Sequence, residues 1–308
     1  MKIAAVDIGT NTVRLLLADV VGRSGHLRVD QAERFEVITK LGEGLDASGR
    51  LGEEPMRRAL DGLARYSEVI AAAGIEHAGA VATEATRSAA NGDEFLARAT
   101  EALGFHPRVI DGIEEADLTF LGATRAAEPA ESFCVIDVGG GSTEFVVGHS
   151  FPDYAMSIEI GSVRLTERIL SKGLGTPAAV RGYVDSVFAG VRPPYVPQRV
   201  LGSGGTFVTV GAVARGLSKD EAEGHHGLVL SHSELRSTVD RLLAMSIAEV
   251  AALPAVPQGR AEVLQAGAVC AERAVAHIGG DELTVSVSDI LDGLALHLTE
   301  EGMTGSEA

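Results

Sequence analysis

A glycine-rich segment in the middle of the chain constrains the fold most strongly. It spans Ser132–Gly148 and reads SFCVIDVGGGSTEFVVG. An apolar run precedes three successive glycines and a second apolar run follows them, which predicts a β-hairpin with a tight turn. Because glycine has no Cβ, the backbone N–H groups of such a turn can close around an anion such as phosphate. The segment therefore predicts an anion-binding hairpin.

The same pattern occurs at the N-terminus. IAAVDIGTNTVRLLLADV aligns without a gap with FCVIDVGGGSTEFVVGHS, at an offset of 130 residues, the difference between positions 137 and 7. Asp7 matches Asp137, and Gly9 matches Gly139. Self-similarity at a fixed offset indicates duplicated units, and we interpret it as two whole domains that each open with this hairpin. The alternative is two unrelated hairpins that share D-x-G by chance.

Carboxylates flank both turns. Asp7 and Asp137 end the strands that enter the turns, and Glu144 follows the second turn. Mg²⁺ prefers one or two carboxylates together with phosphate oxygens and water. We therefore predict Asp7, Asp137 and Glu144 as metal ligands. If the two turns face each other, they would clamp a phosphoryl chain from both sides.

Length and charge bound the remaining interpretations. A chain of 308 residues has room for two domains with full cores. Its net charge of −17 argues against a general nucleic-acid surface, which needs a basic face. A phosphorylated substrate remains compatible, because Mg²⁺ and a few arginines can reverse the sign of the potential inside a cleft.

The sequence also bears on location. No apolar run approaches the roughly 20 residues of a membrane span, and no signal-peptide cleavage pattern follows the first residues. The two cysteines, Cys134 and Cys270, fall in a predicted strand and a predicted helix and do not indicate a disulfide scaffold. We expect a cytoplasmic protein without a membrane partner.

Strands and helices alternate outside the hairpins. Short apolar or alternating runs with β-branched residues predict strands at 29–38, 79–83, 108–111, 154–160, 199–202 and 283–288. Helical spacing predicts helices that begin at Pro55 and at Glu114, and helices over 93–103, 231–245, 260–278 and 290–299.

The residues of two motifs allow two interpretations each. Glu114 and Glu115 open a helix, and carboxylates in a first turn are favoured by the helix dipole without any catalytic role. The third glycine turn, Gly202–Thr206, opens another helix and is a candidate anion or nucleotide site. Its glycines equally suit tight packing.

Three histidines raise the question of a metal site. His225, His226 and His232 match no common zinc spacing, and no cysteine lies near them. We interpret them as surface or loop histidines.

Six motifs together resemble one known family. They are DIGTNT, TEATR, GIEEA, DVGGGSTE, IGSVRLTE and GSGGT, and the resemblance runs from Met1 to about His297. The two hairpins and the last motif resemble the sugar kinase, Hsp70 and actin superfamily. TEATR and GIEEA are absent from kinases and actins generally, so within the superfamily the chain resembles the exopolyphosphatase and guanosine pentaphosphate phosphohydrolase family.

The resemblance implies an α/β fold of two ribonuclease-H-like (actin-like ATPase) domains, with mixed sheets flanked by helices and an active-site cleft between them. We expect the domains at residues 1–127 and 128–308, with a C-terminal helix at about 290–300 that packs back on the first domain.

The resemblance also implies the chemistry and the site. It implies hydrolysis of a terminal phosphoanhydride with Mg²⁺, with Mn²⁺ as an alternative, and it gives the catalytic role to Glu115. Asp7, Asp137 and Glu144 would hold the metal. The expected phosphate-binding residues are Thr10, Asn11, Thr12, Arg87, Gly139, Gly140, Gly141, Ser142, Ser203, Gly204, Gly205 and Thr206.

Two departures from the family bear on the substrate. Longer members continue with a helical C-terminal half, whereas this chain ends at Ala308. Where the family often shows S-x-x-G-L-R-E-G, this chain reads SVSDILDG, with Asp289 for the first glycine and Leu291 for the arginine. We therefore expect short inorganic polyphosphate as the substrate, with guanosine pentaphosphate as the alternative. A kinase or actin-like ATPase and a non-catalytic polyphosphate or nucleotide sensor fit less well, and a homodimer is compatible with the sequence.

Overall fold

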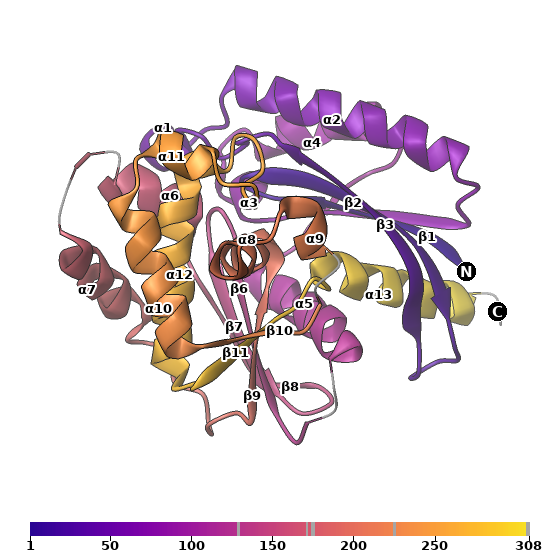
Figure 1. Cartoon of the computed structure of the whole chain (residues 1–308). Helices are drawn as coiled ribbons and strands as arrows, with labels where there is room; N and C mark the ends of the chain where they lie inside the picture. Colours follow the sequence, from indigo (N-terminus) through magenta and orange to yellow (C-terminus); the bar gives the residue numbers. More distant parts are fainter. Residues whose placement is uncertain (128–129, 171, 174–175, 224–225, 306–308) are drawn as a thin grey trace. The chain divides into compact units, whose positions relative to one another are not determined.

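The structure is a computed structural model that describes residues 1–127, 130–170, 172–173, 176–223 and 226–305. It divides into two compact units (Figure 1). Unit 1 comprises Met1–Ala126 together with the C-terminal segment from Ile290, and unit 2 comprises Ala127–Asp289. The C-terminal helix therefore belongs to the same unit as the N-terminal hairpin.

Strands and helices alternate in both units. The strands are β1 (Lys2–Ile8), β2 (Thr12–Val21), β3 (Arg28–Ile38), β4 (His77–Ala82), β5 (Arg108–Val109), β6 (Phe133–Val138), β7 (Thr143–Gly148), β8 (Pro152–Ile158), β9 (Arg199–Ser203), β10 (Leu228–Ser231) and β11 (Glu282–Val285). The helices are α1 (Leu45–Ser48), α2 (Glu53–Ala72), α3 (Glu84–Ser88), α4 (Gly92–Leu103), α5 (Gly112–Ala126), α6 (Ser162–Leu165), the π-helical turn η1 (Thr166–Leu170), α7 (Pro177–Phe188), α8 (Gly204–Arg215), α9 (Lys219–Glu223), α10 (His232–Ala244), α11 (Ile247–Ala251), α12 (Ala261–Ile278) and α13 (Ile290–Gly305).

The described residues form two mixed sheets whose strand orders match. The sheet of unit 1 has the order β3-β2-β1-β4-β5, with β1, β2 and β3 antiparallel and with β4 and β5 parallel to β1. The sheet of unit 2 has the order β10-β11-β9-β6-β7-β8 and repeats this pattern from β8 to β11, with β10 added at the edge. Two mixed sheets flanked by helices confirm the expected fold class.

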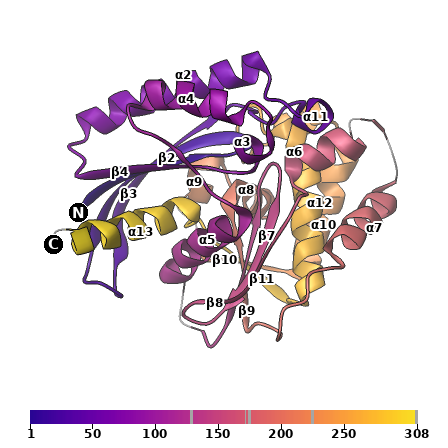
Figure 2. The same ribbon diagram turned by 180° about the vertical axis from the view of Figure 1, so that it is seen from behind.

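Helices cover both faces of the sheet in unit 1, and this explains the apolar sequence of β1. Ala4 and Val6 join the core under α2 and α4, whereas Ile3 and Ala5 join the core under α5 and α13. Figures 1 and 2 show α2 and α13 on opposite faces of this sheet. Successive residues of a strand point to opposite faces, so a strand covered on both faces reads as a continuous apolar run.

The C-terminal helix packs closely within unit 1. A Cβ atom at Gly293 would lie 1.8 Å from the carbonyl oxygen of Leu118, so α13 approaches α5 at a distance that only glycine permits. Arg34 Nη2 on β3 also donates to both carboxylate oxygens of Asp292 at 2.7 and 2.8 Å. Leu291 is 2% exposed and fills the core.

The core of unit 2 forms around α12. Cys134 on β6 and Cys270 on α12 are both fully buried in it, in the strand and the helix where the sequence places them. Both thiols are reduced, and burial raises the pKa of Cys270 to about 12. In the part of the chain that the structure describes, no helix is long and apolar enough to cross a membrane.

Several elements differ from the sequence prediction. The strand predicted at 283–288 is β11 at Glu282–Val285, and neither α7 nor β10 was predicted. Two further differences have a physical reason. The strand expected at 108–111 is only the two residues of β5, because Asp111 ends it and caps the next helix: its Oδ1 accepts from the backbone N–H groups of Ile113 and Glu114, both at 2.9 Å. Helix α3 was not predicted, because five residues are too few for a periodic apolar pattern.

Candidate functional site

The two predicted hairpins have the same backbone geometry. In the first, which we call hairpin 1 (β1 and β2), the N–H of Gly9 donates to the carbonyl of Thr12 at 2.9 Å. In hairpin 2 (β6 and β7), the N–H of Gly139 donates to the carbonyl of Ser142 at 3.1 Å. We call Gly9–Thr12 turn 1 and Gly139–Ser142 turn 2. The register agrees as well, because Asp7 pairs with Arg14 and Asp137 pairs with Glu144.

The residue opposite the aspartate distinguishes the hairpins. Directly opposite residues of an antiparallel pair lie on the same face, with their side chains in reach of each other. In hairpin 1, Arg14 donates to Asp7 Oδ2 from Nη2 at 2.7 Å and from Nε at 3.1 Å. In hairpin 2, the position opposite Asp137 holds Glu144, which is 1% exposed and accepts from Ser157 Oγ at 2.7 Å.

The donor set of hairpin 2 suits a hard divalent cation. Asp137 and Glu144 present carboxylate oxygens on one face beside a turn of three glycines, and Mg²⁺ takes one or two carboxylates with phosphate oxygens and water. Among the described residues, no group of three His, Cys, Asp or Glu side chains is placed to hold a metal ion. A metal at this hairpin would therefore draw further ligands from substrate and water.

Turn 1 is enclosed by the segment that follows β3. The carbonyl of Asn11 accepts from the N–H groups of Thr39 and Lys40 at 3.0 and 2.9 Å. Asn11 is 9% exposed, and its Oδ1 atom is buried without a hydrogen-bond partner among the described residues. A buried polar atom of this kind marks a place for a water, an ion or a ligand atom. The side chain of Thr10 is buried, whereas that of Thr12, at the start of β2, is half-buried.

The predicted catalytic glutamate lies beside an arginine. Glu115 occupies the first turn of α5, and its Oε2 lies 3.8 Å from Nη1 of Arg87 on α3. Nη1 of Arg87 also donates to the carbonyl of Ile110 at 2.6 Å, which fixes the guanidinium near the start of α5. The side chain of Glu115 is 14% exposed. The structure thus brings Glu115 and Arg87 together.

Glu114 and Glu115 point to different partners. Glu114 forms an ion pair with Arg108 of β5, and its side chain is 38% exposed. Burial and the nearby carboxylates of Asp111 and Glu114 raise the pKa of Asp117 on the same helix. Glu114 and Glu115 thus each lie beside a different arginine.

The first N–H groups of helix α6 donate to the carbonyls of turn 2. The carbonyl of Gly139 accepts from the N–H of Ser162 at 2.9 Å, and the carbonyl of Gly140 accepts from the N–H groups of Val163 and Arg164 at 2.9 and 3.2 Å. A Cβ atom at Gly161 would lie 2.6 Å from the Gly139 carbonyl oxygen, so only glycine fits there. The IGSVRLTE motif thus fixes the shape of turn 2.

The third glycine turn meets hairpin 2 within unit 2. Gly204 has a φ of +81°, and a Cβ atom there would lie 2.4 Å from Asp137 Oδ1. The hydroxyls of Ser203 and Thr206 donate to the carbonyls of Ser288 and Val138 at 3.3 and 2.8 Å. The close approach of Asp137 thus requires glycine at position 204. Both hydroxyls are already bonded to backbone carbonyls, so an anion at this turn would contact mainly backbone N–H groups.

Comparison with known proteins places the chain in a family. The model of the Ppx/GppA phosphatase family matches residues 20–300. The chain belongs to the Ppx/GppA phosphatase family. It is 36% identical to Exopolyphosphatase 2 of Mycobacterium tuberculosis over 96% of this chain and 98% of that one. It is 31% identical to a putative exopolyphosphatase of Haemophilus influenzae over 69% of this chain and 67% of that one.

Solved structures agree with this membership. An exopolyphosphatase-like protein superposes with a TM-score of 0.86 at 32% identity, over 96% of this chain and 97% of that chain. An exopolyphosphatase from Cytophaga hutchinsonii gives 0.84 at 26% identity, over 98% of both chains. The resemblance stated from the motifs is confirmed, as is the expectation of an enzyme of the exopolyphosphatase kind.

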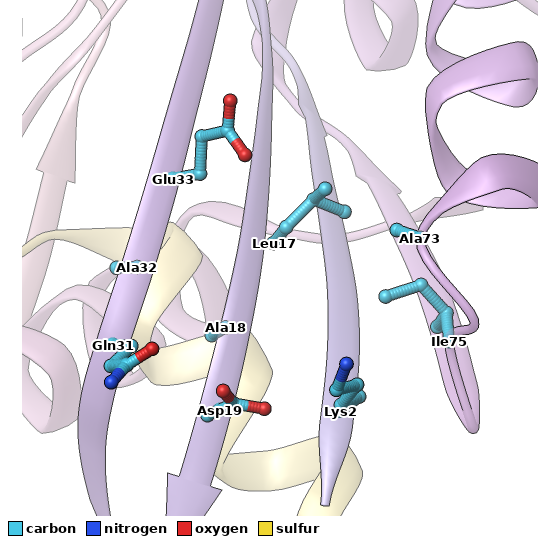
Figure 3. Close-up of a pocket in the computed structure, with 9 residues that line it drawn as sticks. All are labelled: Lys2, Leu17, Ala18, Asp19, Gln31, Ala32, Glu33, Ala73 and Ile75. Atoms are coloured by element: carbon cyan, nitrogen blue, oxygen red, sulfur yellow. The ribbon is translucent and has the colours of Figure 1, made fainter.

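Two cavities of unit 1 lie away from turn 1. One, of about 290 Å³, is lined by residues at the start of β1 and by the facing parts of β2 and β3, including Lys2, Asp19 and Glu33 (Figure 3). Lys2 and Asp7 are five residues apart on β1, or roughly 17 Å along an extended strand. The other, of about 440 Å³, is lined by Arg108 and Glu114 among others. Neither cavity is lined by a predicted site residue of this Ppx/GppA-family chain.

The histidines have ordinary environments. His226 lies in an exposed turn and accepts from the N–H of Val287 at 3.4 Å, and His225 lies outside the described residues. His232 agrees with the expectation of a surface residue, because 35% of its side chain is exposed. It begins α10, and its Nε2 is a buried atom 3.7 Å from the fully buried carboxylate of Glu272.

Sequence reasoning missed three charged residues near the predicted site. Arg14 contacts Asp7, Glu84 contacts Thr10, and Arg260 lies against Gly205, where a Cβ atom would be 2.2 Å from Nη1. The gapless alignment of the hairpins could have revealed Arg14, because it aligns this arginine with Glu144. Glu84 lies inside TEATR, and its acidic side chain directly after a buried strand was the available signal. A lone arginine before α12 gave no signal.

Proposed function

We propose that this member of the Ppx/GppA phosphatase family is a metal-dependent hydrolase that releases terminal orthophosphate from inorganic polyphosphate. The observation that carries the proposal is the pair Asp137 and Glu144 beside the glycines of turn 2. Two carboxylates next to a backbone cradle for phosphate are what a magnesium–phosphate complex requires. The assignments of metal, base and phosphate-binding residues are parts of the proposal.

In the proposed reaction, Glu115 acts as general base. Water attacks the terminal phosphorus, Glu115 accepts a proton from that water, and the P–O bond to the rest of the chain breaks. Orthophosphate and a polyphosphate shorter by one unit leave. A bound Mg²⁺ or Mn²⁺ would neutralise phosphate charge, and Asp137 and Glu144 would hold it.

The remaining residues bind and orient the substrate. Arg87, held by the Ile110 carbonyl, offers a guanidinium that matches phosphate geometry. Asn11 offers an amide whose Nδ2 group can donate to a phosphate oxygen, whereas its buried Oδ1 can accept from a water or bind a cation. The backbone of turn 1 and turn 2 supplies N–H donors, and phosphoryl transfer depends mostly on such positioning and charge neutralisation.

Inorganic polyphosphate is favoured because curated relatives of the chain are named exopolyphosphatases. Short chains are favoured by the net charge of −17 and by the buried Leu291, which gives no cation where relatives often carry one. Each phosphate beyond the site would face an acidic surface and gain nothing from it.

Phosphate release tests the proposal. Short polyphosphate, long polyphosphate, guanosine pentaphosphate and ATP are compared at equal chain-end concentration, each with Mg²⁺, with Mn²⁺ and with a chelator. We expect the highest kcat/KM on short polyphosphate, loss in chelator and recovery with either metal. A preference for guanosine pentaphosphate would move the chain to the other activity of its family, and full activity in chelator would refute the metal site.

A further inference from the structure

The buried carboxylate of Glu84 has none of the roles assigned above. Glu84 is the first residue of α3 and is 2% exposed. Acidic side chains are almost never fully buried unless they are paired. Its Oε2 accepts from the hydroxyl of Thr10 in turn 1 at 3.3 Å, and its Oε1 accepts from the hydroxyl of Ser88 at 2.9 Å.

Thr10 is enclosed on its other sides as well. Its carbonyl accepts from the N–H of Gly42 at 2.8 Å. A Cβ atom at Gly42 would lie 2.4 Å from Cγ2 of Thr10 and 3.6 Å from Cβ of Ala85. The Thr10 side chain is 94% buried by this packing, with its hydroxyl on Glu84. In this arrangement the backbone N–H of Thr10 would contact a phosphate, and the side chain of Thr10 anchors the turn.

Turn 2 is fixed by different contacts. The residue equivalent to Thr10 is Gly140, which has no side chain to anchor, and its carbonyl is held by the N–H groups of Val163 and Arg164. Turn 2 is therefore fixed by a backbone contact with α6. Turn 1 also has backbone contacts, because its carbonyls accept from the N–H groups of Thr39, Lys40 and Gly42. It has in addition a side-chain contact with α3, which Glu84 supplies.

Helix α3 also carries the phosphate-binding candidate Arg87. The N–H of Arg87 donates to the carbonyl of Thr83 at 3.1 Å, so α3 begins as a tight turn around Glu84. The Arg87 guanidinium lies 3.8 Å from Glu115. One buried carboxylate thus connects turn 1 to the short helix that presents Arg87.

We propose that Glu84 is a positioning residue that sets turn 1 relative to Arg87 through the hydroxyl of Thr10. The role rests on the proposed function, because it matters only if turn 1 and Arg87 bind the same phosphates. Glu84 does not touch the substrate. Its loss moves the backbone donors of turn 1 out of register with Arg87 and weakens binding more than it slows the chemical step.

Variants of the two partners test the proposal. Thr10→Val keeps the shape and removes the hydroxyl, and Glu84→Gln keeps one carbonyl acceptor while it removes the charge. We expect KM for short polyphosphate to rise about 10-fold in Thr10→Val and about 3- to 5-fold in Glu84→Gln, the size of one or part of one hydrogen bond to a charged group. We expect kcat to change less than about 3-fold in both.

Ser88→Ala is the matched control. It removes the other hydroxyl from the same carboxylate without touching turn 1, and we expect KM to stay within about 2-fold of the wild type. The double variant Thr10→Val/Glu84→Gln should be no worse than Thr10→Val alone, because each change breaks the same contact. Thermal unfolding of every variant shows whether it is folded.

Three results would overturn the proposal: unchanged KM in folded Thr10→Val and Glu84→Gln, additive effects in the double variant, or an equal rise of KM in Ser88→Ala. A failure of the proposed function is distinguishable, because the wild type would then release no phosphate. In that case calorimetry measures the Kd of each variant for inorganic tripolyphosphate in the presence of Mg²⁺. A rise of Kd in Thr10→Val and Glu84→Gln but not in Ser88→Ala supports the positioning role of Glu84. Absence of binding to the wild type would overturn it.

Discussion

Hairpin 1 and hairpin 2 have the same backbone geometry, and they differ in the residue that stands opposite the aspartate. In unit 1, Asp7 lies 2.7 Å from Arg14, and Glu115 lies 3.8 Å from Arg87. In unit 2, Asp137 pairs across the hairpin with a second carboxylate, Glu144. The strand register of hairpin 1 thus places an arginine opposite its aspartate, whereas the register of hairpin 2 places a glutamate opposite its aspartate.

This difference suggests different roles for the two hairpins. Mg²⁺ takes one or two carboxylates together with phosphate oxygens and water, so the carboxylates of hairpin 2 suit a divalent metal. In hairpin 1 the equivalent of Glu144 is Arg14, which already neutralises Asp7 and adds positive charge near turn 1. We therefore expect unit 1 to supply proton transfer and phosphate binding, and unit 2 to supply the metal.

The largest expected effect is at Glu115. Glu115→Gln keeps the size and removes the basicity, so kcat should fall about 10²-fold or more while KM and the Mg²⁺ requirement change little. Steady-state phosphate release over a range of Mg²⁺ concentrations measures all three. Glu114→Gln is the control, because Glu114 pairs with Arg108 instead. If Glu114→Gln is inactive and Glu115→Gln is not, the role moves to Glu114.

The next effect separates the two aspartates. Asp137→Asn removes a charged ligand, so the Mg²⁺ concentration for half-maximal activity should rise roughly 10-fold or more. Asp7→Asn should change that concentration much less, because Asp7 Oδ2 accepts two hydrogen bonds from Arg14. Magnesium titrations of both variants measure the difference. Equal shifts would support Asp7 as a metal ligand beside Asp137 and Glu144 and would contradict different roles for the two hairpins.

A smaller effect concerns the stability of hairpin 1. Arg14→Gln leaves the mostly buried Asp7 without its cation, and we expect the free energy of unfolding to fall by roughly 1–2 kcal/mol. The double variant Arg14→Gln/Asp7→Asn should recover part of this loss, because it removes the charge that needs a partner. Denaturant unfolding measures both. No recovery in the double variant would mean that Arg14 stabilises hairpin 1 by packing and not by charge.

The smallest effect concerns the length of the substrate. With a net charge of −17, phosphates outside the site are repelled, more so at low salt where screening is weak. We expect kcat/KM per chain end to fall as polyphosphate lengthens, and the fall to lessen at moderate salt. Activity that rises with length and is lost on adding salt would reveal a basic track and contradict the preference for short chains.

Much of the fold could be predicted because it depends on local patterns. The hairpins followed from apolar runs around glycines, and the repeat followed from a gapless alignment that the two registers now reproduce. Long helices such as α2 and α12 carry enough periodicity to be predicted. Short elements such as α3 and β10 do not, since five or four residues show no period.

The sequence named candidate site residues but not the partners that they contact. TEATR indicated Arg87, whereas its contacts with Ile110 and Glu115 depend on how α3 and α5 pack in unit 1. Thr10 was predicted as a phosphate ligand, and the structure places its hydroxyl on Glu84. Hydroxyl groups are both donors and acceptors, so their residue type alone does not tell which partner they take.

The sequence by itself determined that this chain carries two equivalent hairpins with glycine turns, because backbone conformations open only to glycine and alternating apolar runs are encoded residue by residue. Only the tertiary structure decided which charges meet. Arg14 on Asp7, Glu144 opposite Asp137 and Glu84 on Thr10 are contacts between residues brought together by strand register and helix packing. Electrostatic interactions depend on distance in space, and separation along the chain does not fix that distance.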